Sequence, residues 1–532
     1  MFIDARTLPN QHTIETDICI IGAGAAGITI ARQFIGLSTR VCVLESGGFE
    51  SEADSQLLAH GLNAGLPYYP LIAARLRYFG GTTNHWAAYC RPFHDLDFET
   101  RAWVPHSGWP LSRSDLAFYY EDAGKVCQLP TFDWNTDAWQ KQTAYPLLPL
   151  LGDRVVSRPV QIIHPKIFRR FGKVYREELR QATNITTYLY ANTTELETDE
   201  VGKTVTRVHA ACLSGTTFSV TARQIVLAAG GIENPRLLLL SNRRQPAGLG
   251  NQHDVVGRFF LEHPRFVAGL LQPTDPSLSV RFYQPHRGPA GRLRGYLSLP
   301  EELQRQEQLV DVQVRLIPEI DERYASALES RGVTSLKHLL QELWQKKTPD
   351  DLGKHVRNVV ADIDDIASST FWWARFRGEY PLNQVKLITR VEQAPNPQSR
   401  VTLADERDQL GLRRAQLHWH LSPIDKHSIR RTLEIIGMEC GRAGLGRVKI
   451  LLSDDDTTWP SETRGGYHHM GTTRMHDDSK QGVVDRNCQI HGLSNVFVAG
   501  SSVFPTSGSG TPTLLLIALA LRLADHLKER MI

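Results

Sequence analysis

Short apolar runs that end at glycines or at an acidic residue are the clearest pattern near the start of this chain. Residues 17–21 form an apolar run that stops at Gly22, and apolar residues at helical spacing follow from Ile28 to Ile35. A second apolar run, residues 41–44, ends in Glu45. Apolar runs of this length are typical of buried strands, and a spacing of three to four is typical of a helix. The pattern predicts a strand, a glycine turn, a helix and a second strand followed by an acid.

The glycine turn between these elements has the spacing of a dinucleotide-binding loop. Gly22 permits the tight turn, Gly24 lets backbone amides approach a pyrophosphate, and Gly27 lets the helix pack close to the strand. The amino end of the following helix attracts phosphate, and Glu45 is placed to accept ribose hydroxyls. The unit therefore predicts dinucleotide binding.

Two distant segments are expected to add strands to the same sheet. Residues 224–229 run into Gly230, and residues 495–499 run into Gly500. Residues 263–465, with apolar runs at 312–317, 384–389 and 416–421, are expected to form an inserted antiparallel sheet with covering helices.

Two helix starts are also predicted. Pro235 is expected to open a helix with Asn234 as its N-cap, and Thr511 is expected to cap a final helix with Pro512 in its first turn.

Composition and charge narrow the class of protein. The chain of 532 residues has 41% hydrophobic and 22% charged residues and a net charge of +3, which indicates a globular protein and argues against nucleic-acid binding. Seven cysteines without a CxxC pair are typical of free thiols in a reducing compartment. The first residues lack an apolar signal region, and the apolar run 514–521 ends at Arg522, too short for a membrane span. We therefore expect a soluble, cytoplasmic protein.

Five ordered segments together resemble the glucose–methanol–choline (GMC) oxidoreductases, which are FAD enzymes that oxidise alcohols. The segments are residues 22–27 with Glu45, 80–86, 229–235, 256–264, and 468–475 continuing to 513. The likeness is nearest to pyranose oxidases and to the flavoprotein subunits of sugar dehydrogenases. It implies an α/β fold, in which a Rossmann-like FAD-binding domain of discontinuous segments carries an inserted α+β substrate domain. We expect FAD-binding parts at 1–95, 183–262 and 466–532, a substrate-domain or flap segment at 96–182, and a substrate-binding domain at 263–465.

The resemblance also assigns residues to roles. His468, the first residue of the His-x-x-Gly-Thr pattern, occupies the place of the catalytic base, and His469 is expected to pack or to lie behind it. The expected cofactor-binding residues are Gly22, Gly24, Ala25, Ala26, Gly27, Glu45, Ser46, Gly80, Gly81, Thr82, Asn84, His85, Ala229, Gly230, Asn234, Gly500, Ser501, Pro512 and Thr513.

Two positions leave alternatives open. Relatives carry Asn or His where this chain has Thr511, which is either a helix cap alone or also a hydrogen-bonding group for the reacting oxygen. His85 has the spacing of a histidine that pyranose oxidases bond to FAD, and non-covalent FAD is the alternative.

The expected activity is oxidation of a CH–OH group in a sugar, polyol or other alcohol. The resemblance implies hydride transfer to flavin N5, with His468 as the base and oxygen or another acceptor taking the electrons. One alternative is a tailoring enzyme for desaturation, cyclisation or lyase chemistry, and the other is a flavin-loaded subunit that assembles with an electron-carrying partner.

Other candidate sites have weaker patterns. No metal site is expected, because His418 and His420 lack a third ligand in motif spacing and residues 454–456 are more typical of a solvated loop. No Gly-x-Ser-x-Gly elbow supports a hydrolase. Trp372 and Trp373 could line a sugar-sized cavity, or pack in the core or at a surface contact.

Overall fold

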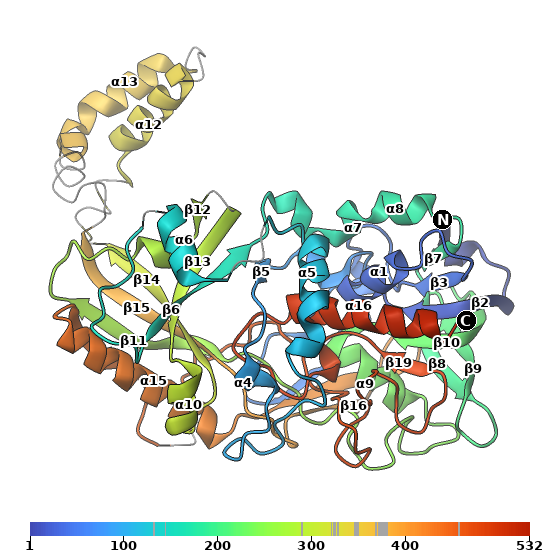
Figure 1. Ribbon diagram of the computed structural model, residues 1–532. Helices are drawn as coiled ribbons and strands as arrows, with labels where there is room; N and C mark the ends of the chain where they lie inside the picture. The colour runs from blue at the N-terminus through green and yellow to red at the C-terminus, as the bar shows by residue number, and fades with distance from the viewer. Residues whose placement is uncertain are drawn as a thin grey trace.

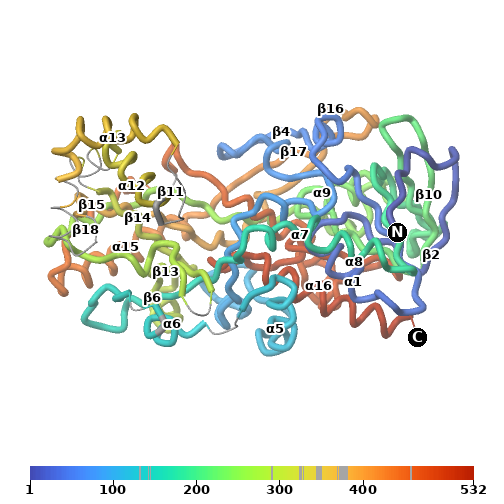
Figure 2. Tube along the Cα trace, turned by 90° about the horizontal axis from the view of Figure 1, so that it is seen from above, coloured from blue at the N-terminus to red at the C-terminus, as the bar shows by residue number. Residues whose placement is uncertain are grey.

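The computed structural model describes residues 1–130, 134–143, 145–288, 291–320, 322, 326, 329–344, 350–367, 370, 381–455 and 458–531. Trp372, Trp373 and Asp456 lie outside the described residues. Two large sheets form the two ends of the molecule, and a small sheet lies along one side between them (Figures 1 and 2).

A mixed sheet forms one end and contains the predicted glycine-turn unit. Its order is β1 (Phe2–Asp4), β7 (Ile185–Leu189), β3 (Val41–Leu44), β2 (His12–Ile21), β10 (Thr217–Leu227), β9 (Val205–Ala211) and β8 (Asn192–Thr198), with β19 (Val496–Val498) paired to β10. Strand β10 runs parallel to both β2 and β19, with Ile225 opposite Cys19 and Val496. The two distant runs do add strands to the first sheet, so this prediction is confirmed.

Helices cover both faces of the mixed sheet (Figure 1). Helix α16 (Thr513–Glu529) packs against α1 (Ala25–Arg32) and α5 (Ala117–Val126), and α9 (Gly230–Leu240) lies on the opposite face. Because both faces are covered, β3 and β19 are buried apolar runs, and β2 is buried and apolar over its last four residues, 18–21.

The other end is the antiparallel sheet expected for the middle of the chain. Its order is β18 (Gly446–Ile450), β11 (Arg265–Pro273), β15 (Leu382–Val391), β14 (Val312–Ile320), β13 (Gly291–Ser298), β6 (Val156–Ile162) and β5 (Tyr89–Cys90), with β12 (His286–Gly288) paired to β13. Helix α15 (Pro423–Arg442) covers one face, where Ile429 and Leu433 join Val314 and Leu297 in one apolar core. Helices α12 (Arg331–Trp344) and α13 (Leu352–Ala361) project away from this end (Figure 1).

One expected strand belongs to a different sheet. The run at 416–421 lies in β17 (Arg413–Trp419), which pairs with β16 (Arg400–Arg407) and β4 (Leu62–Gly65) in a separate three-stranded sheet. The assignment of this run to the large antiparallel sheet was wrong. Its apolar residues Leu417 and Trp419 pack against Phe260 and Ile232 beside α9, in a core of their own.

Short helices connect these layers. They are η1 (Ala5–Thr7), α2 (Ala53–Leu57), α3 (Leu71–Ala74), η2 (Gly81–Asn84), α4 (Asp95–Phe98), η3 (Ser114–Leu116), α6 (Thr136–Thr143), η4 (Lys166–Arg169), α7 (Phe171–Val174), α8 (Arg176–Gln181), η5 (Arg281–Tyr283), α10 (Glu301–Gln306) and η6 (Ser501–Val503). Among the helices of the described residues, none has both the length and the apolar composition needed to cross a bilayer.

The predicted N-cap at Asn234 was wrong. Helix α9 begins at Gly230 with Ala229 as its cap, so Asn234 and Pro235 lie inside the helix. Asn234 turns back instead, and its Oδ1 accepts a hydrogen bond of 2.9 Å from the Ala229 amide. Two glycines begin the helix earlier than the proline, and the asparagine satisfies an amide at its amino end by another route.

The predicted cap at Thr511 was also wrong. Helix α16 has Pro512 at its N-cap position with no side-chain capping bond, and the Thr511 hydroxyl donates to the backbone oxygen of Tyr89 at 2.7 Å. The hydroxyl therefore ties the start of α16 to β5 of the antiparallel sheet instead of bonding an amide of its own helix.

Candidate active site

The turn between β2 and α1 accepts only glycine at two positions. Gly22 has φ of +106°, and a Cβ there would lie 2.7 Å from the Ala228 oxygen. A Cβ on Gly27 would lie 1.9 Å from the Gly22 oxygen. At Gly24, by contrast, a Cβ would meet no heavy atom within 4 Å. The turn is thus tight on its protein side and open at Gly24, where the first amides of α1 lack intrahelical acceptors.

Glu45 lies beside this turn at the end of β3. Its carboxylate accepts hydrogen bonds from the amides of Ala23 at 2.9 Å and Gly47 at 3.1 Å. Burial raises the pKa of Glu45, although these two bonds favour the charged form. The open cradle at Gly24, the free amides of α1 and this held acid fit the pyrophosphate and ribose of FAD.

The second glycine motif contacts the first directly. The Gly80 amide donates to the Ala23 oxygen at 2.8 Å, and a Cβ on Gly81 would lie 3.2 Å from the Gly24 Cα. Helix η2 therefore borders the turn and carries Thr82 and Asn84 with it. The next residue, His85, has an exposed ring that makes no hydrogen bond to any described residue and lies 6.3 Å from the Tyr78 ring.

Helix α9 connects the turn to the C-terminal motif. Pro235 has no amide hydrogen to bond the Gly231 oxygen, and the Thr472 hydroxyl donates to that oxygen at 2.6 Å. Asn234 donates to the Ser502 hydroxyl at 3.0 Å, and Ser501 donates to the His469 oxygen at 2.7 Å. The Gly257 amide donates to the Thr472 oxygen at 2.8 Å, so all five sequence motifs meet at this edge of the mixed sheet.

A pair of histidines forms the chemical centre of this region. The Nδ1 atoms of His468 and His263 lie 2.6 Å apart, with their rings nearly perpendicular at 87°. The other nitrogen of His263, Nε2, lies 2.7 Å from the backbone oxygen of Gly508. A carbonyl oxygen can only accept, so His263 Nε2 is the donor and its Nδ1 carries the lone pair. His468 Nδ1 must then donate to His263, which leaves His468 Nε2 unprotonated and free.

Both histidines are held neutral by their surroundings. Burial lowers the pKa of His263 to about 3. Burial also lowers the pKa of His468 well below its ordinary value, and the neighbouring His263, Arg390, His469 and Arg265 lower it further. Neutral His468 has the protonation state that a general base requires.

Glu262 fixes the backbone around the two histidines. It is fully buried, and its carboxylate accepts from the amides of His263 at 2.8 Å and His468 at 3.0 Å and from the Tyr68 hydroxyl. His469 Nε2 lies 3.0 Å from the same Tyr68 hydroxyl. Glu262 and His263 were not assigned roles from the sequence, although the resemblance already included residues 256–264.

The residue before His468 has a strained backbone. Tyr467 has φ of +63°, a left-handed backbone conformation that residues other than glycine seldom adopt. Its ring stacks on Tyr69 with 4.1 Å between centroids, which holds the strained turn in place. Strain of this kind is commonly found at functional sites.

The start of α16 reaches the histidine pair through the preceding loop. Ser507 and Gly508 provide the oxygens that face His263 Nε2, and Thr511 follows three residues later. Pro512 and Thr513 form the first positions of the helix, with the Leu516 amide donating to the Pro512 oxygen at 2.8 Å. Thr511 is buried and uses its hydroxyl hydrogen on Tyr89, so toward any other group it can only accept.

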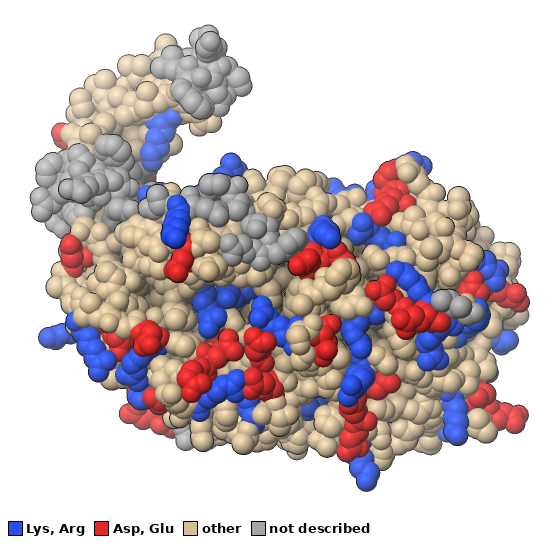
Figure 3. Space-filling view, viewed as in Figure 1, with Lys and Arg blue, Asp and Glu red and all other residues tan. Residues whose placement is uncertain are grey.

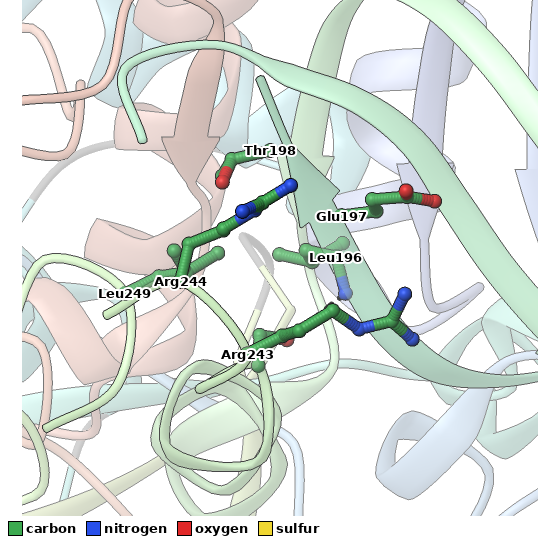
Figure 4. Close-up of a pocket in the computed structure, with 7 residues that line it drawn as sticks. Leu196, Glu197, Thr198, Arg243, Arg244 and Leu249 are labelled. Atoms are coloured by element: carbon green, nitrogen blue, oxygen red, sulfur yellow. Dashed lines mark hydrogen bonds between the residues drawn. The ribbon is translucent and has the colours of Figure 1, made fainter. Parts of the chain in front are cut away.

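A small surface cavity elsewhere on the molecule has no part in this site. It has a volume of about 50 Å³ and lies between β8 and the segment after α9, with Glu197, Arg243 and Arg244 in its wall (Figure 4). Over the described ranges, no group of three His, Cys, Asp or Glu side chains could hold a metal ion.

Family models match most of the chain. The model described as FAD dependent oxidoreductase matches residues 17–332, and the model described as GMC oxidoreductase matches residues 395–520. The fold and the site define a flavin-dependent oxidoreductase. The chain belongs to the GMC oxidoreductase family, as the five motifs predicted, and the cofactor of the family is FAD.

Two of the curated relatives match over nearly their full length. The 2-methyl-1,2-propanediol dehydrogenase of Mycolicibacterium austroafricanum is 23% identical over 97% of this chain and 96% of its own. The fructose dehydrogenase large subunit of Gluconobacter japonicus is 23% identical over 97% of this chain and 98% of its own. A C-glycoside 3-oxidase of Microbacterium trichothecenolyticum is 31% identical over 24% of each chain.

Solved structures share the fold. Pyridoxine 4-oxidase from Mesorbium loti superposes with a TM-score of 0.56 at 18% identity, covering 97% of this chain and 99% of its own. Formate oxidase superposes with a TM-score of 0.52 at 14% identity, covering 98% and 99%. These likenesses confirm the α/β architecture with its antiparallel sheet.

Proposed function

We propose that this enzyme oxidises the CH–OH group of a small alcohol or sugar-like substrate, with His468 Nε2 as the base that takes the hydroxyl proton. The observation that carries the proposal is the hydrogen-bond chain from the Gly508 oxygen through His263 to His468. This chain leaves one unprotonated nitrogen on a half-buried histidine. The names of the curated relatives, a diol dehydrogenase and a sugar dehydrogenase among them, support the same chemistry.

The residues have distinct parts in this reaction. Bound FAD supplies the acceptor for the hydride that leaves the substrate carbon. His468 Nε2 takes the proton, and the resulting positive charge is shared with His263 through the 2.6 Å hydrogen bond. Glu262 fixes the backbones of His263 and His468 relative to each other, so the base is oriented before substrate binds. The turn at residues 22–27, with Glu45, and the loop at 80–85 would hold the cofactor.

Anaerobic mixing of the FAD-loaded enzyme with a panel of alcohols tests this proposal. We expect at least one alcohol to bleach the visible flavin band, and His468→Ala to slow that reduction by roughly 10²–10⁴ while FAD remains bound. His12→Ala is a matched control, because His12 is exposed at the far end of β2 from the glycine turn. If His468→Ala reduced its flavin at the wild-type rate, His468 would not be the base.

The attachment of FAD and its electron acceptor have separate tests. If His85 forms a covalent bond, FAD stays with acid-precipitated wild-type protein and is released from His85→Ala. Release of all FAD from wild-type protein would leave the non-covalent alternative. Rapid reoxidation of the substrate-reduced enzyme by air would identify an oxidase, and reoxidation only by a quinone or another acceptor would identify a dehydrogenase.

A reducing compartment is the proposed location. All seven cysteines are buried and unpaired. Proteins of oxidising compartments commonly join such residues in disulfides. Fractionation of the source cells with an antibody to the protein would test this.

A further inference from the structure

One face of the antiparallel sheet carries arginines where the other carries an apolar core. Val314 and Leu297 lie opposite each other and face α15. Successive side chains of a strand alternate between faces. Arg315 of β14, one residue from Val314, and Arg294 of β13, three residues from Leu297, therefore point away from α15.

Strand register brings two more arginines to the same face. Arg390 of β15 lies opposite both Arg265 of β11 and Gln313 of β14. Gln313 is two residues before Arg315 and shares its face. Four adjacent strands thus present an arginine face, which consists of Arg265, Arg294, Arg315 and Arg390.

Arg294 is buried and the other three arginines are half-buried, and the charge of Glu262 is the carboxylate charge that acts on Arg390. Arg294 is only 8% exposed, and its Nε and Nη1 have no hydrogen-bond partner. Arg315 is half-buried and its Nε also lacks a partner. Across the part of the chain that the structure describes, none of the four forms an ion pair with a carboxylate. The contacts that they do make are weak: Arg265 donates to the Tyr69 hydroxyl at 3.3 Å, and Arg294 lies 5.4 Å from the Tyr89 ring.

The four charges act on one another. Burial lowers the pKa of Arg390 to about 10, and the charges of Arg265 and Arg294 add to this effect. Burial also lowers the pKa of Arg315, with Arg294 and Arg390 as the largest charged neighbours. Guanidinium groups carry a positive charge in proteins, so the arginines repel one another in the folded chain. Such groups are rare in protein interiors unless a partner neutralises them.

The arginine face adjoins the histidine pair. Arg265 follows His263 by two residues in the chain, and the charges of Arg265 and Arg390 are among those that lower the pKa of His468. Tyr89, whose oxygen accepts from Thr511, borders Arg294 from the other side. A molecule placed at His468 Nε2 therefore has this positive surface beside it.

We propose that the arginine face binds an anionic group of the substrate, so that the enzyme acts on alcohols that carry a carboxylate or a phosphate. The proposal rests on the proposed alcohol oxidation for the reacting end of the substrate. Guanidinium groups offer paired N–H donors that match the oxygens of either anion. The face of the molecule in Figure 3 does not offer an equivalent field, because basic and acidic side chains are interspersed on it.

Anion binding is measured first, without turnover. The FAD-loaded enzyme is titrated by calorimetry with inorganic phosphate or with acetate, at constant ionic strength kept by potassium chloride. We expect saturable binding that Arg315→Gln and Arg390→Gln each weaken by about tenfold or more. Arg207→Gln is the matched control, because Arg207 is exposed on β9 of the mixed sheet. Phosphate binding tighter than acetate would indicate a phosphate-bearing substrate, and the reverse order a carboxylate-bearing one.

Thermal unfolding of wild-type protein gives a measurement that needs no variant. Phosphate or acetate should raise the melting temperature more than chloride at equal ionic strength. No saturable binding of either anion, or binding that Arg315→Gln, Arg390→Gln and Arg207→Gln all leave unchanged, would overturn the proposal.

Turnover separates this proposal from the proposed function. D-glucitol, D-gluconate and D-glucitol 6-phosphate are compared, together with glycerol, glycerate and glycerol 3-phosphate, as flavin-reducing substrates. We expect an anionic member to have the highest kcat/KM, and Arg315→Gln to narrow its advantage over the neutral member by tenfold or more. If neutral alcohols bleach the flavin and the anions neither bind nor react, the anion site is wrong and alcohol oxidation stands. If the anions bind in an arginine-dependent way and no alcohol bleaches the flavin, alcohol oxidation is wrong and the anion site stands.

Discussion

Two groups of buried arginines in this molecule differ in where their negative charge comes from. The first, here called the Glu233 cluster, consists of Arg75, Arg77 and Arg236 with the acids Glu233 and Asp408. Glu233 contacts all three arginines at 2.7–3.1 Å, and Asp408 contacts Arg236 at 2.6 Å. The second is the arginine face, which has no carboxylate of the described residues within ion-pair distance.

The pKa of Glu233 reflects this difference in local charge. Burial alone would raise the pKa of Glu233, but the charges of Arg77, Arg75 and Arg236 lower it far below its ordinary value. A cavity of about 30 Å³ with Arg77, Glu233, Arg236 and Asp408 in its wall has room for no more than about one water. The Glu233 cluster therefore has two acids for its three arginines, whereas the arginine face has none among the described residues within ion-pair distance. This difference in local acids is what the proposed anion site rests on.

Removing the central acid of the Glu233 cluster should have the largest effect on stability. Glu233→Gln leaves three buried guanidinium groups with one remaining acid, and we expect the free energy of unfolding to fall by about 3–5 kcal/mol. Urea unfolding followed by circular dichroism measures the change. Glu195→Gln, which breaks an ion pair with the exposed Arg243, should lower the free energy of unfolding by less than about 1 kcal/mol. A Glu233→Gln protein as stable as Glu195→Gln would mean that the cluster is not neutralised as described.

Thr511, which lies just before α16 and bonds Tyr89 of β5, tests the arginine face from its edge. Thr511→Asn introduces a longer side chain with a donor, and we expect it to change kcat/KM ratios across neutral and anionic alcohols by about 1–3 kcal/mol. Thr511→Ala loses the bond to the Tyr89 oxygen and should lower stability by about 1 kcal/mol. Unchanged ratios in Thr511→Asn, with FAD still bound, would restrict this side chain to joining α16 and β5.

The pH dependence of flavin reduction measures how far the arginine charge reaches. The pKa of His468 is lowered, so the base stays unprotonated below its ordinary value of 6.5, and the acidic limb of the reduction rate should lie below pH 6.5. Arg390→Gln removes a positive charge and makes protonation easier, so the limb should move upward by about one pH unit. The charged and titratable groups around His468 are His263, His469, Arg265, Arg390 and Glu262. We expect the protonation of Glu262 to change least, because its carboxylate accepts hydrogen bonds from backbone amides. If the acidic limb did not move in Arg390→Gln, the charge of the arginine face would not influence the pKa of His468.

The smallest expected effect is a gain in stability, opposite in sign to the loss expected for Glu233→Gln. Arg315→Met removes one charge from an uncompensated group and keeps a chain of similar length, so the free energy of unfolding should rise by about 1 kcal/mol in the absence of added anions. Urea unfolding without phosphate measures this gain in the free energy of unfolding. We expect the gain to disappear when phosphate is present. A loss of stability in Arg315→Met would mean that the folded chain already neutralises this arginine.

Local chemistry was predictable from the sequence where neighbours in the chain decide it. The glycine turn at Gly22 and Gly27 follows from backbone sterics within one short segment, and the runs at 224–229 and 495–499 are recognisable as strands from their own residues. The predictions of caps at Asn234 and Thr511 were wrong. Helix α9 begins earlier, at Gly230, and the Thr511 hydroxyl bonds Tyr89, which lies 422 positions away in the sequence.

Longer-range features could not be predicted in this way. Arg265, Arg294, Arg315 and Arg390 are scattered over four strands, and only strand register brings them to one face. The same is true of the run at 416–421, whose partners are β16 and β4. His263 was inside a recognised motif, but its bond to His468 spans 205 positions of sequence and depends on the fold.

The proline in α9 has a consequence for how the chain is made. Because Pro235 leaves the Gly231 oxygen without a helical partner, that oxygen depends on Thr472, which the ribosome adds 241 residues later. Strand β19, which completes the pairing of β10, is later still. The nascent protein can form its first strands and glycine turn early, but the edge that holds the flavin closes only when the final segment arrives. Cofactor loading is therefore expected to follow translation, and a ribosome-bound chain ending before residue 472 should retain no FAD.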